Sequence, residues 1–248
     1  MSTRTVFRIT GTDHETFLQN LVTNDVGKAQ DGLVWTALLT PQGKYLADFF
    51  LLADGDGLLL DVDSSLAAGL AQRLTMYRLR ADVSIEQTDI NVARGTGDTP
   101  DGAFSDPRDP SLGWRAYDGR TSEDADWDAL RIAAGIPESG VELIPNESYP
   151  LEQRFEALSG VDFKKGCYVG QEVTARMKHK TELRKGLARV AVSGTAEPGT
   201  TILNEAGKEA GTLYSQAGGA GLAYLRFDRA LGEMTAGDAI VTYTKDAT

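Results

Sequence analysis

The sequence is poor in cysteine, in histidine and in long apolar runs. Cys167 is the only cysteine among 248 residues, so no disulfide can form within the chain. This is typical of a protein in a reducing compartment, and we expect a cytoplasmic location. No apolar run approaches the roughly 18 residues that a membrane-spanning helix needs, and the first residues lack the apolar core of a signal peptide. We therefore expect no membrane segment.

The scarcity of histidine argues against the common metal and hydrolase sites. His14 and His179 are the only two histidines, and with a single cysteine they cannot supply a zinc site. No His or Asn is placed near Cys167 in a way that indicates a thiol hydrolase. The nucleophile elbow, the Walker loop and the Cys-x-x-Cys pair are also absent. We expect no stably bound metal in the isolated chain.

Basic residues are in the minority, with 25 Lys and Arg against 36 Asp and Glu and a net charge of −11. This balance argues against direct nucleic-acid binding. Residues 162–189 are the exception, with eight basic residues and three acidic ones. A basic segment in an acidic protein indicates an anionic small ligand or an acidic partner, and the alternative is a solvated helix face. The eight basic residues are Lys164, Lys165, Arg176, Lys178, Lys180, Arg184, Lys185 and Arg189.

The elements that the pattern predicts come in a mixed order, which indicates an α+β fold rather than a βαβ alternation. Thr12 and Glu15 form a capping-box pattern at the start of a helix, and Pro41-Gln42-Gly43 predicts a hairpin turn. Pro150 is placed to begin another helix, and residues 95–112 predict a loop. Strands are predicted at residues 6–9, 33–40, 44–53, 58–62, 83–86, 91–94 and 114–117, and helices at residues 13–24, 64–78 and 126–134.

The last quarter of the chain has a different pattern. Short strand candidates alternate with Gly and Pro at a spacing of about ten residues, which predicts a small antiparallel β-barrel. We therefore expect an α+β region of two intertwined subdomains at residues 1–184 and a barrel at residues 185–248. The strand candidates are residues 187–192, 201–203, 209–215, 221–227 and 239–244.

Cys167 lies in a basic stretch between two glycines, Gly166 and Gly170. From Gly170 onward apolar residues recur at a spacing of four, which predicts a helix. The thiol would then lie just before a helix N-terminus, where the backbone favours anions, a thiolate included. A lone cysteine is more often a small buried hydrophobe, and that alternative stays open.

Three roles fit a thiol in this setting. The loop can bind an anionic ligand and leave the thiol incidental. The thiol can be redox-reactive or accept a persulfide. It can also supply one ligand to an iron–sulfur cluster. Because such clusters normally take four protein ligands, a second chain or a small thiol would have to supply the others.

Residues 165–172, Lys-Gly-Cys-Tyr-Val-Gly-Gln-Glu, match the signature K-G-C-Y-x-G-Q-E at every fixed position, and here the sequence resembles the YgfZ family of folate-binding proteins. The family is similar to the T-protein of the glycine cleavage system, an aminomethyltransferase. The resemblance implies a ring of ferredoxin-like α+β subdomains around a folate-holding opening, followed by a C-terminal antiparallel β-barrel. Further agreement lies at residues 11–13, 17–19, 23–25, 38–43, 106–108, 112–115 and 130–137.

The resemblance implies a tetrahydrofolate-binding accessory protein for the assembly or repair of iron–sulfur clusters, and for tRNA modification that depends on them. Cys167 would be the reactive thiol or a partial cluster ligand that a partner completes. The implied partners are the folate and iron–sulfur assembly or client proteins. We expect the chain to be a monomer without direct contact to nucleic acid or membrane.

The resemblance also assigns site residues. Arg131 matches an arginine that contacts folate in the T-protein, and the alternative is a salt bridge from the helix of residues 126–134. The stretch Leu112-Gly113-Trp114-Arg115 lacks the carboxylate that holds the pterin there, which disfavours the alternative of a folate-dependent aminomethyl or one-carbon transferase. Enzyme activity stays open, and a folate-independent interaction scaffold is the third alternative. The implied folate contacts are Arg131, Lys165, Gly166, Tyr168, Gly170, Gln171, Glu172 and Arg176.

Overall fold

The computed structural model describes residues 3–179 and 183–244, which form two compact units. The first unit contains Met1–Ala125, Pro145–Pro150 and Phe155–Arg176. The second contains Asp126–Ile144, Leu151–Arg154 and Met177–Thr248. In the described part of the chain no helix has the length and hydrophobicity of a membrane span.

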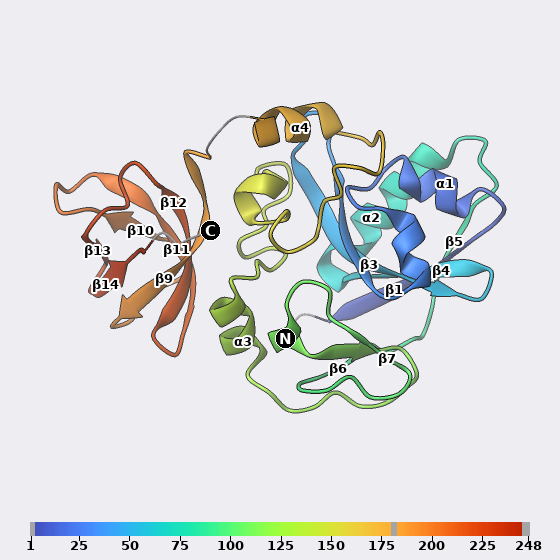
Figure 1. Cartoon of the computed structure of the whole chain (residues 1–248), viewed down its shortest axis with the longest axis horizontal. Helices are drawn as coiled ribbons and strands as arrows, with labels where there is room; N and C mark the ends of the chain where they lie inside the picture. Colours follow the sequence, from blue (N-terminus) through green and yellow to red (C-terminus); the bar gives the residue numbers. More distant parts are fainter. Residues whose placement is uncertain (1–2, 180–182, 245–248) are drawn as a thin grey trace. The chain divides into compact units, whose positions relative to one another are not determined.

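A five-stranded antiparallel sheet is the centre of the first unit, with the strand order β2-β3-β4-β1-β5 (Figure 1). The hairpin predicted at residues 41–43 joins β2 to β3, and Thr40 N donates to Lys44 O at 2.8 Å across it. The strands are β1 (Arg4–Thr10), β2 (Val34–Leu39), β3 (Tyr45–Asp54), β4 (Gly57–Asp63) and β5 (Ser84–Gln87).

Two helices, α1 (His14–Gln19) and α2 (Ser64–Arg78), cover one face of this sheet. Leu18 of α1 and Leu70 of α2 join one apolar core with Leu60 of β4. Successive side chains of a strand point to opposite faces, so Asp61, the next residue of β4, faces away from the helices.

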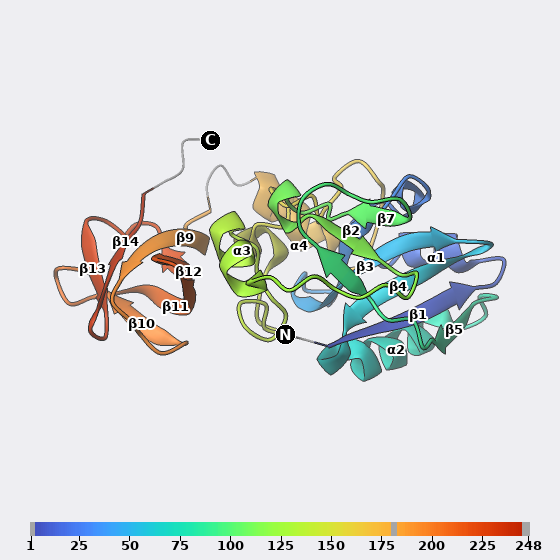
Figure 2. The ribbon, with the colours of Figure 1, turned by 90° about the horizontal axis from the view of Figure 1, so that it is seen from below.

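The opposite face of the sheet carries a buried ionic network. Asp61 accepts hydrogen bonds from Arg4 Nε at 2.6 Å and from Arg115 Nη1 at 3.3 Å. Asp106 accepts from Arg108 at 2.7 Å and from Arg115 at 3.2 Å. Arg115 is buried and Arg4 and Arg108 are partly buried, and each cation has a carboxylate partner that offsets the cost of its burial. A small sheet of β6 (Ala93–Gly95), β8 (Trp114–Ala116) and β7 (Ala103–Ser105) supplies Arg115, and Figure 2 shows β7 and α2 on opposite sides of β1 and β4.

The second unit contains a closed six-stranded barrel, so the predicted barrel is confirmed. Helix α3 (Trp127–Ala134) belongs to this unit, because its Ile132 packs against Leu187 and Leu222 of the barrel. The barrel order is β10-β11-β12-β9-β14-β13. Its strands are β9 (Lys185–Ser193), β10 (Thr200–Leu203), β11 (Glu209–Ala217), β12 (Ala220–Arg226), β13 (Glu233–Ala236) and β14 (Ala239–Thr242).

The helix predicted at residues 13–24 is only the six-residue α1, and its predicted capping box is wrong. The Thr12 hydroxyl donates to Asp82 at 3.0 Å, 70 positions away, instead of capping the helix. Asp13 occupies the N-cap position without a side-chain cap bond. A tertiary partner has therefore replaced the local one.

The helix predicted from Pro150 is wrong as well. Only a short 3₁₀ helix forms there, and Arg154, with a φ of +64°, follows its last residue in the left-handed region. Phe155 is nonetheless buried, with its ring centroid 4.2 Å from that of Trp35. The predicted loop at residues 95–112 contains the unpredicted strand β7. The 3₁₀ helices are η1 (Val26–Gln30), η2 (Pro110–Leu112) and η3 (Pro150–Gln153).

Candidate functional site

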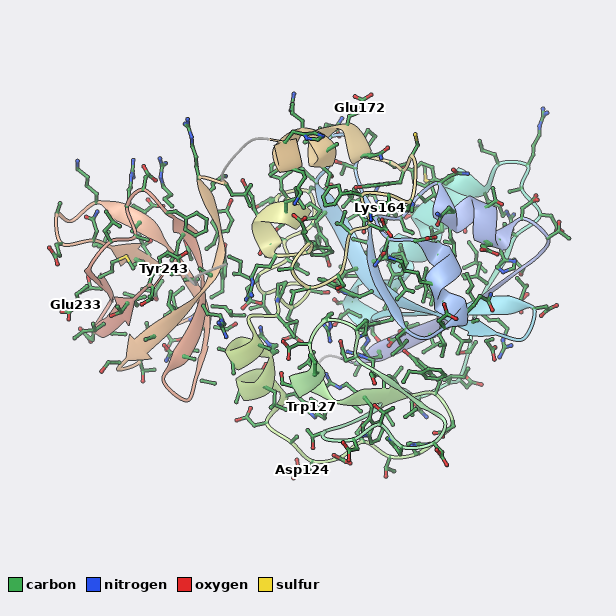
Figure 3. The ribbon with its side chains drawn as sticks, in the orientation of Figure 1. Asp124, Trp127, Lys164, Glu172, Glu233 and Tyr243 are labelled. Atoms are coloured by element: carbon green, nitrogen blue, oxygen red, sulfur yellow. The ribbon has the colours of Figure 1, made fainter. Side chains whose placement is uncertain are left out.

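The candidate site is the Cys167 loop, residues 162–170, which leads into helix α4 (Gln171–His179). The thiol of Cys167 is free and the residue is exposed, so the alternative of a buried structural cysteine does not hold. The predicted helix after Gly170 is present. Figure 3 shows Lys164 in this loop and Glu172 on α4.

Lys165 fixes the loop to the end of α1. Its Nζ donates to the backbone carbonyls of Gln19 at 2.5 Å and of Val22 at 2.7 Å. An ammonium is well placed there because the carbonyls at a helix C-terminus carry partial negative charge. Burial lowers the pKa of Lys165 to about 8, against the opposing influence of Asp25, Asp162 and Cys167. The ammonium of Lys165 therefore has partners within the fold, and its contact with a ligand stays a prediction.

Gly170 brings the loop against the β2–β3 hairpin. Its φ is +84°, and a Cβ at this position would lie 2.6 Å from Thr40 O and 3.0 Å from the Cα of Gly43. Gly43 in turn has a φ of +74°, and its Cβ position would meet Val173 of α4 at 2.8 Å. Only glycine allows this backbone approach. The sequence predicted Gly43 as a turn residue but not as a support of the Cys167 loop.

Gln171 and Asp162 close the loop at its two ends. The Gln171 amide donates to Gly166 O at 3.0 Å. Asp162 accepts from Lys164 N at 2.7 Å and from Lys28 Nζ at 2.6 Å, and the Lys28 bond lowers the pKa of this carboxyl. The loop that presents the thiol is thus held by its own side chains as well as by its neighbours.

Tyr168 points inward from the same loop. The residue is buried, and the ammonium of Lys165 lies 5.0 Å from the centroid of its ring. Burial raises the pKa of the Tyr168 phenol, and the nearby Thr174 hydroxyl reduces this rise. The phenol oxygen is buried without a hydrogen bond of good geometry among the described residues. Tyr168 anchors the loop to the interior and leaves Cys167 outside.

Arg131 belongs to the second unit, whereas the Cys167 loop belongs to the first. Its Nη1 lies 3.1 Å from Glu142 and its Nε lies 2.9 Å from Asp128 and 3.1 Å from Glu138. Burial lowers the pKa of Arg131, but Glu142 and the other carboxylates outweigh that effect and raise it. The guanidinium takes part in the salt bridges that the alternative prediction described.

The predicted folate contacts differ in their surroundings. Arg131 and Lys165 bind internal partners, and Glu172 and Arg176 are exposed on α4. The first unit does hold a cavity of about 180 Å³, but none of the predicted contacts lines it. Ligand pockets usually reach about 300 Å³ or more. This cavity is therefore not a site that the predicted contacts form, and the folate contacts stay a prediction.

A model of the C-terminal β-barrel domain of CAF17 matches residues 184–247. The iron–sulfur cluster assembly factor IBA57 of Homo sapiens is 30% identical, over 93% of this chain and 78% of its own length. The homologue from Mycosarcoma maydis is 32% identical, over 79% of this chain and 57% of its own length. The crystal structure of the glycine cleavage system aminomethyltransferase T from Bartonella henselae superposes with a TM-score of 0.74 at 12% identity, over 98% of this chain and 84% of that one. This structure confirms the predicted aminomethyltransferase-like fold.

The comparisons correct the expected location. The relatives from Homo sapiens, Mycosarcoma maydis, Neurospora crassa and Mus musculus are all described as mitochondrial, which contradicts the cytoplasmic prediction. The single cysteine indicates only that the fold needs no disulfide, and it does not distinguish one reducing compartment from another.

Proposed function

The chain belongs to the family of iron–sulfur cluster assembly factors that includes human IBA57, and on this premise we propose that it acts in iron–sulfur cluster assembly through Cys167. The observation that carries the proposal is an exposed thiol on a loop held by Lys165, Gly170 and Gln171. A thiol presented in this way can reach a second protein without rearrangement of the fold.

The cluster is the cargo of this reaction, and Cys167 loses its thiol proton and supplies one thiolate ligand to a cluster iron. Because clusters normally take four protein ligands, the assembly partner supplies the remaining ones. The chain's own contribution is to present the thiol in a fixed place and to release it when the partner leaves. Bonds from backbone and side chains on three sides of the loop reduce the conformational entropy lost on binding.

Replacement of Cys167 by serine tests the proposal. In a strain that lacks the protein, Cys167→Ser should fail to restore the activity of iron–sulfur enzymes, while Lys164→Ser, a change at a neighbouring exposed residue, should restore it. Among the described residues the hydrogen bonds that hold the loop are made by other groups than the exposed thiol, so both variants should fold. Full restoration by Cys167→Ser would refute the role of the thiol.

Tetrahydrofolate binding is the second part of the proposal, and its support is the sequence signature of residues 165–172. Calorimetry with a tetrahydrofolate polyglutamate should show binding to the full chain at millimolar concentration or below. Because Arg131 is saturated by carboxylates, Arg131→Met should leave that affinity unchanged if exposed residues such as Arg176 hold the ligand. The absence of heat at millimolar ligand would remove folate from the proposal.

The proposed clients are iron–sulfur proteins, including an enzyme of tRNA modification. In this scheme the chain itself acts as a monomer and contacts the assembly partner rather than the tRNA. The loss of modified nucleosides in the deletion strain should follow the loss of cluster in the modifying enzyme. Normal modification alongside lost activity of other cluster enzymes would remove this client.

A further inference from the structure

One side of α2 has properties that its role in the fold does not explain. We define the α2 outer face as Ser65, Gly69, Arg73 and Met76, together with Leu79 and Arg80 just beyond the helix. The four helical positions are spaced by four, four and three residues, so they lie on one stripe. All six residues are exposed, and α2 is the outer layer on its side of the sheet (Figure 2).

The large apolar side chains of this face are open to solvent. Met76 is 70% exposed and Leu79 is 88% exposed. Side chains with this exposure contribute almost no apolar burial to folding. The large side chains of Met76 and Leu79 therefore do not stabilise the fold of this chain.

The backbone of Leu79 is also unfavourable for leucine. Its φ is +48° and its ψ is −103°, and Ala81 N donates to Arg78 O at 2.8 Å across it. These are the features of the first central position of a type II′ turn, which glycine prefers. Leucine at this position has an unfavourable backbone conformation, and its exposed side chain gives no burial in return. This combination indicates a role outside the fold.

The charge of the face is opposite to that of the molecule. Residues 64–81 contain no Asp or Glu, but they contain Arg73, Arg78 and Arg80. The whole chain, in contrast, has a net charge of −11. Arg78 donates to Val83 O at 3.1 Å and so is partly used by the turn. Arg73 and Arg80 leave the face attractive to carboxylates.

A cavity of about 180 Å³ opens beside the same stripe, between α2 and the β2–β3 hairpin. Leu38, Leu46 and Leu70 line it, and its polar members are Ser65, Arg73 and Asn146. A Cβ on Gly69 would meet nothing within 4 Å, so this side of the helix is open. An apolar cavity of about 150 Å³ holds a benzene molecule, so this one has room for one large apolar side chain.

We propose that the α2 outer face is a docking surface for a protein partner that inserts an apolar side chain beside Gly69 and surrounds it with carboxylates facing Arg73 and Arg80. An anchor in a pocket with a charged rim is the usual form of a protein interface. In a symmetric dimer a second copy would present the same face, which has no acidic residue from Ser64 to Ala81 to pair with Arg73 and Arg80. A lipid surface offers no protruding side chain to fill the cavity.

The docking surface and the Cys167 loop border the same short helix. Thr12 and Asp13, before α1, bond to Asp82, which closely follows Arg80. Lys165 binds carbonyls at the other end of α1. The six residues of α1 span about 9 Å. A protein interface that buries about 800 Å² on each side extends over a greater distance than this, so one partner can cover both ends of α1. On the proposed function, the partner docked here is therefore the one that completes the cluster site at Cys167.

Photo-crosslinking in the full-length protein tests the surface. A benzoylphenylalanine at position 79 should cross-link one protein in cells, and mass spectrometry should show an acidic segment with thiol ligands in that protein. The control position is Leu231, which is 71% exposed in the second unit and should not give this product. Identical products from both positions, or cross-links to lipid or to a second copy, would overturn the proposal.

Variants then test the cavity and the charge separately. Gly69→Phe and Arg73→Glu should each lower the yield of the cross-link about tenfold, the loss of one good anchor contact. Ala68→Phe adds the same ring at a neighbouring exposed position off the stripe and should leave the yield unchanged. Undiminished cross-linking by Gly69→Phe and Arg73→Glu, with folding confirmed by circular dichroism, would contradict the docking surface.

The two proposals fail in different ways. If Cys167→Ser retains the activity of iron–sulfur enzymes while the cross-link at position 79 depends on Gly69 and Arg73, the proposed function is wrong and the surface stands. If Cys167→Ser loses that activity while Gly69→Phe leaves the cross-link intact, the surface is wrong and the function stands.

Discussion

At the scale of single residues, the structure separates cations that serve the fold from those that remain at the surface. Arg115 is buried with two carboxylates and lies 4.0 Å from the centroid of the Phe50 ring, and Arg131 is held by three carboxylates. Arg73 and Arg80 are exposed on a stretch without acids. The local sequence pattern does not show which of these four arginines is buried, because all of them lie near apolar residues.

Asp106→Asn should destabilise the protein by about 3–5 kcal/mol, because it removes a buried carboxylate that pairs with the buried Arg115 and the partly buried Arg108. Burial raises the pKa of Asp106, but Arg108 and Arg115 outweigh it and hold the pKa well below its usual range. The stabilisation by ionised Asp106 is therefore complete above the pKa of aspartate in the unfolded chain, near 4. It decreases as the pH falls towards the lower pKa of Asp106 in the folded protein. Denaturant titrations from pH 7 to pH 3 should show a steeper loss for wild type than for the variant.

The matched control is Asp118→Asn, which removes the carboxylate of an exposed pair with Arg120. Its free energy of unfolding at pH 7 should stay close to that of wild type because water screens the pair. Equal losses in the two variants would show that the buried network has no special contribution.

Leu79→Gly should raise the free energy of unfolding by about 1 kcal/mol. The substitution relieves the backbone strain at a φ of +48°, which outweighs the larger entropy of glycine in the unfolded chain. Chemical denaturation measures the change. Leu231→Gly is the control, at an exposed leucine without a positive φ, and it should destabilise by about 0.5–1 kcal/mol. Destabilisation by both would contradict the strain at Leu79.

At the scale of elements, the Cys167 loop depends on neighbours far away in the sequence. The end of α1, the turn between β2 and β3 and the start of α4 each hold one side of it. The motif of residues 165–172 is therefore a set of structural contacts around one exposed thiol. The lysine, glycines and glutamine shape the loop, and the cysteine is the residue that it presents.

Gly170→Ala should destabilise the protein by about 2–4 kcal/mol. The methyl group would meet Thr40 O at 2.6 Å, and the φ of +84° adds backbone strain. Gly166→Ala has a similar φ of +99° but no atom within 4 Å of its Cβ position, so it should cost only about 1–2 kcal/mol. Denaturant unfolding of both variants separates the contact from the strain. Equal costs would mean that the hairpin does not support the loop.

At the scale of the whole molecule, the division into units differs from a simple cut between barrel and remainder. Residues 126–144 and 151–154 group with the barrel, although the chain returns to the first unit between and after them. Ile132 of α3 covers Leu187 and Leu222 on the outside of the barrel. The barrel is therefore stabilised by a segment that the sequence places with the N-terminal region.

Ile132→Ala should lower the stability of the second unit by about 2–4 kcal/mol, because it removes a buried side chain that is 2% exposed. Hydrogen exchange should speed up at the barrel amides of β9 and β12. The amides of the five-stranded sheet serve as the internal control and should exchange as in wild type. Unchanged exchange in β9 and β12 would show that the barrel does not need α3.

The sequence by itself determined the features that depend on local chemistry. Alternation and turn residues predicted the barrel and the β2–β3 hairpin, the element order predicted the α+β class, and the motif of residues 165–172 predicted a special cysteine loop. These signals are local because strand periodicity and turn geometry depend on a few neighbouring residues.

Only the tertiary structure decided where long-range partners overrule local preference. Thr12 bonds to Asp82 instead of capping α1, Lys165 donates to a carbonyl at the end of α1, and Arg131 binds carboxylates of its own unit. It also showed that Cys167 is exposed and that the acid-free side of α2 is open beside a cavity. A side chain pairs with the group that folding places next to it. The distance between residues far apart in the sequence cannot be read from the sequence itself.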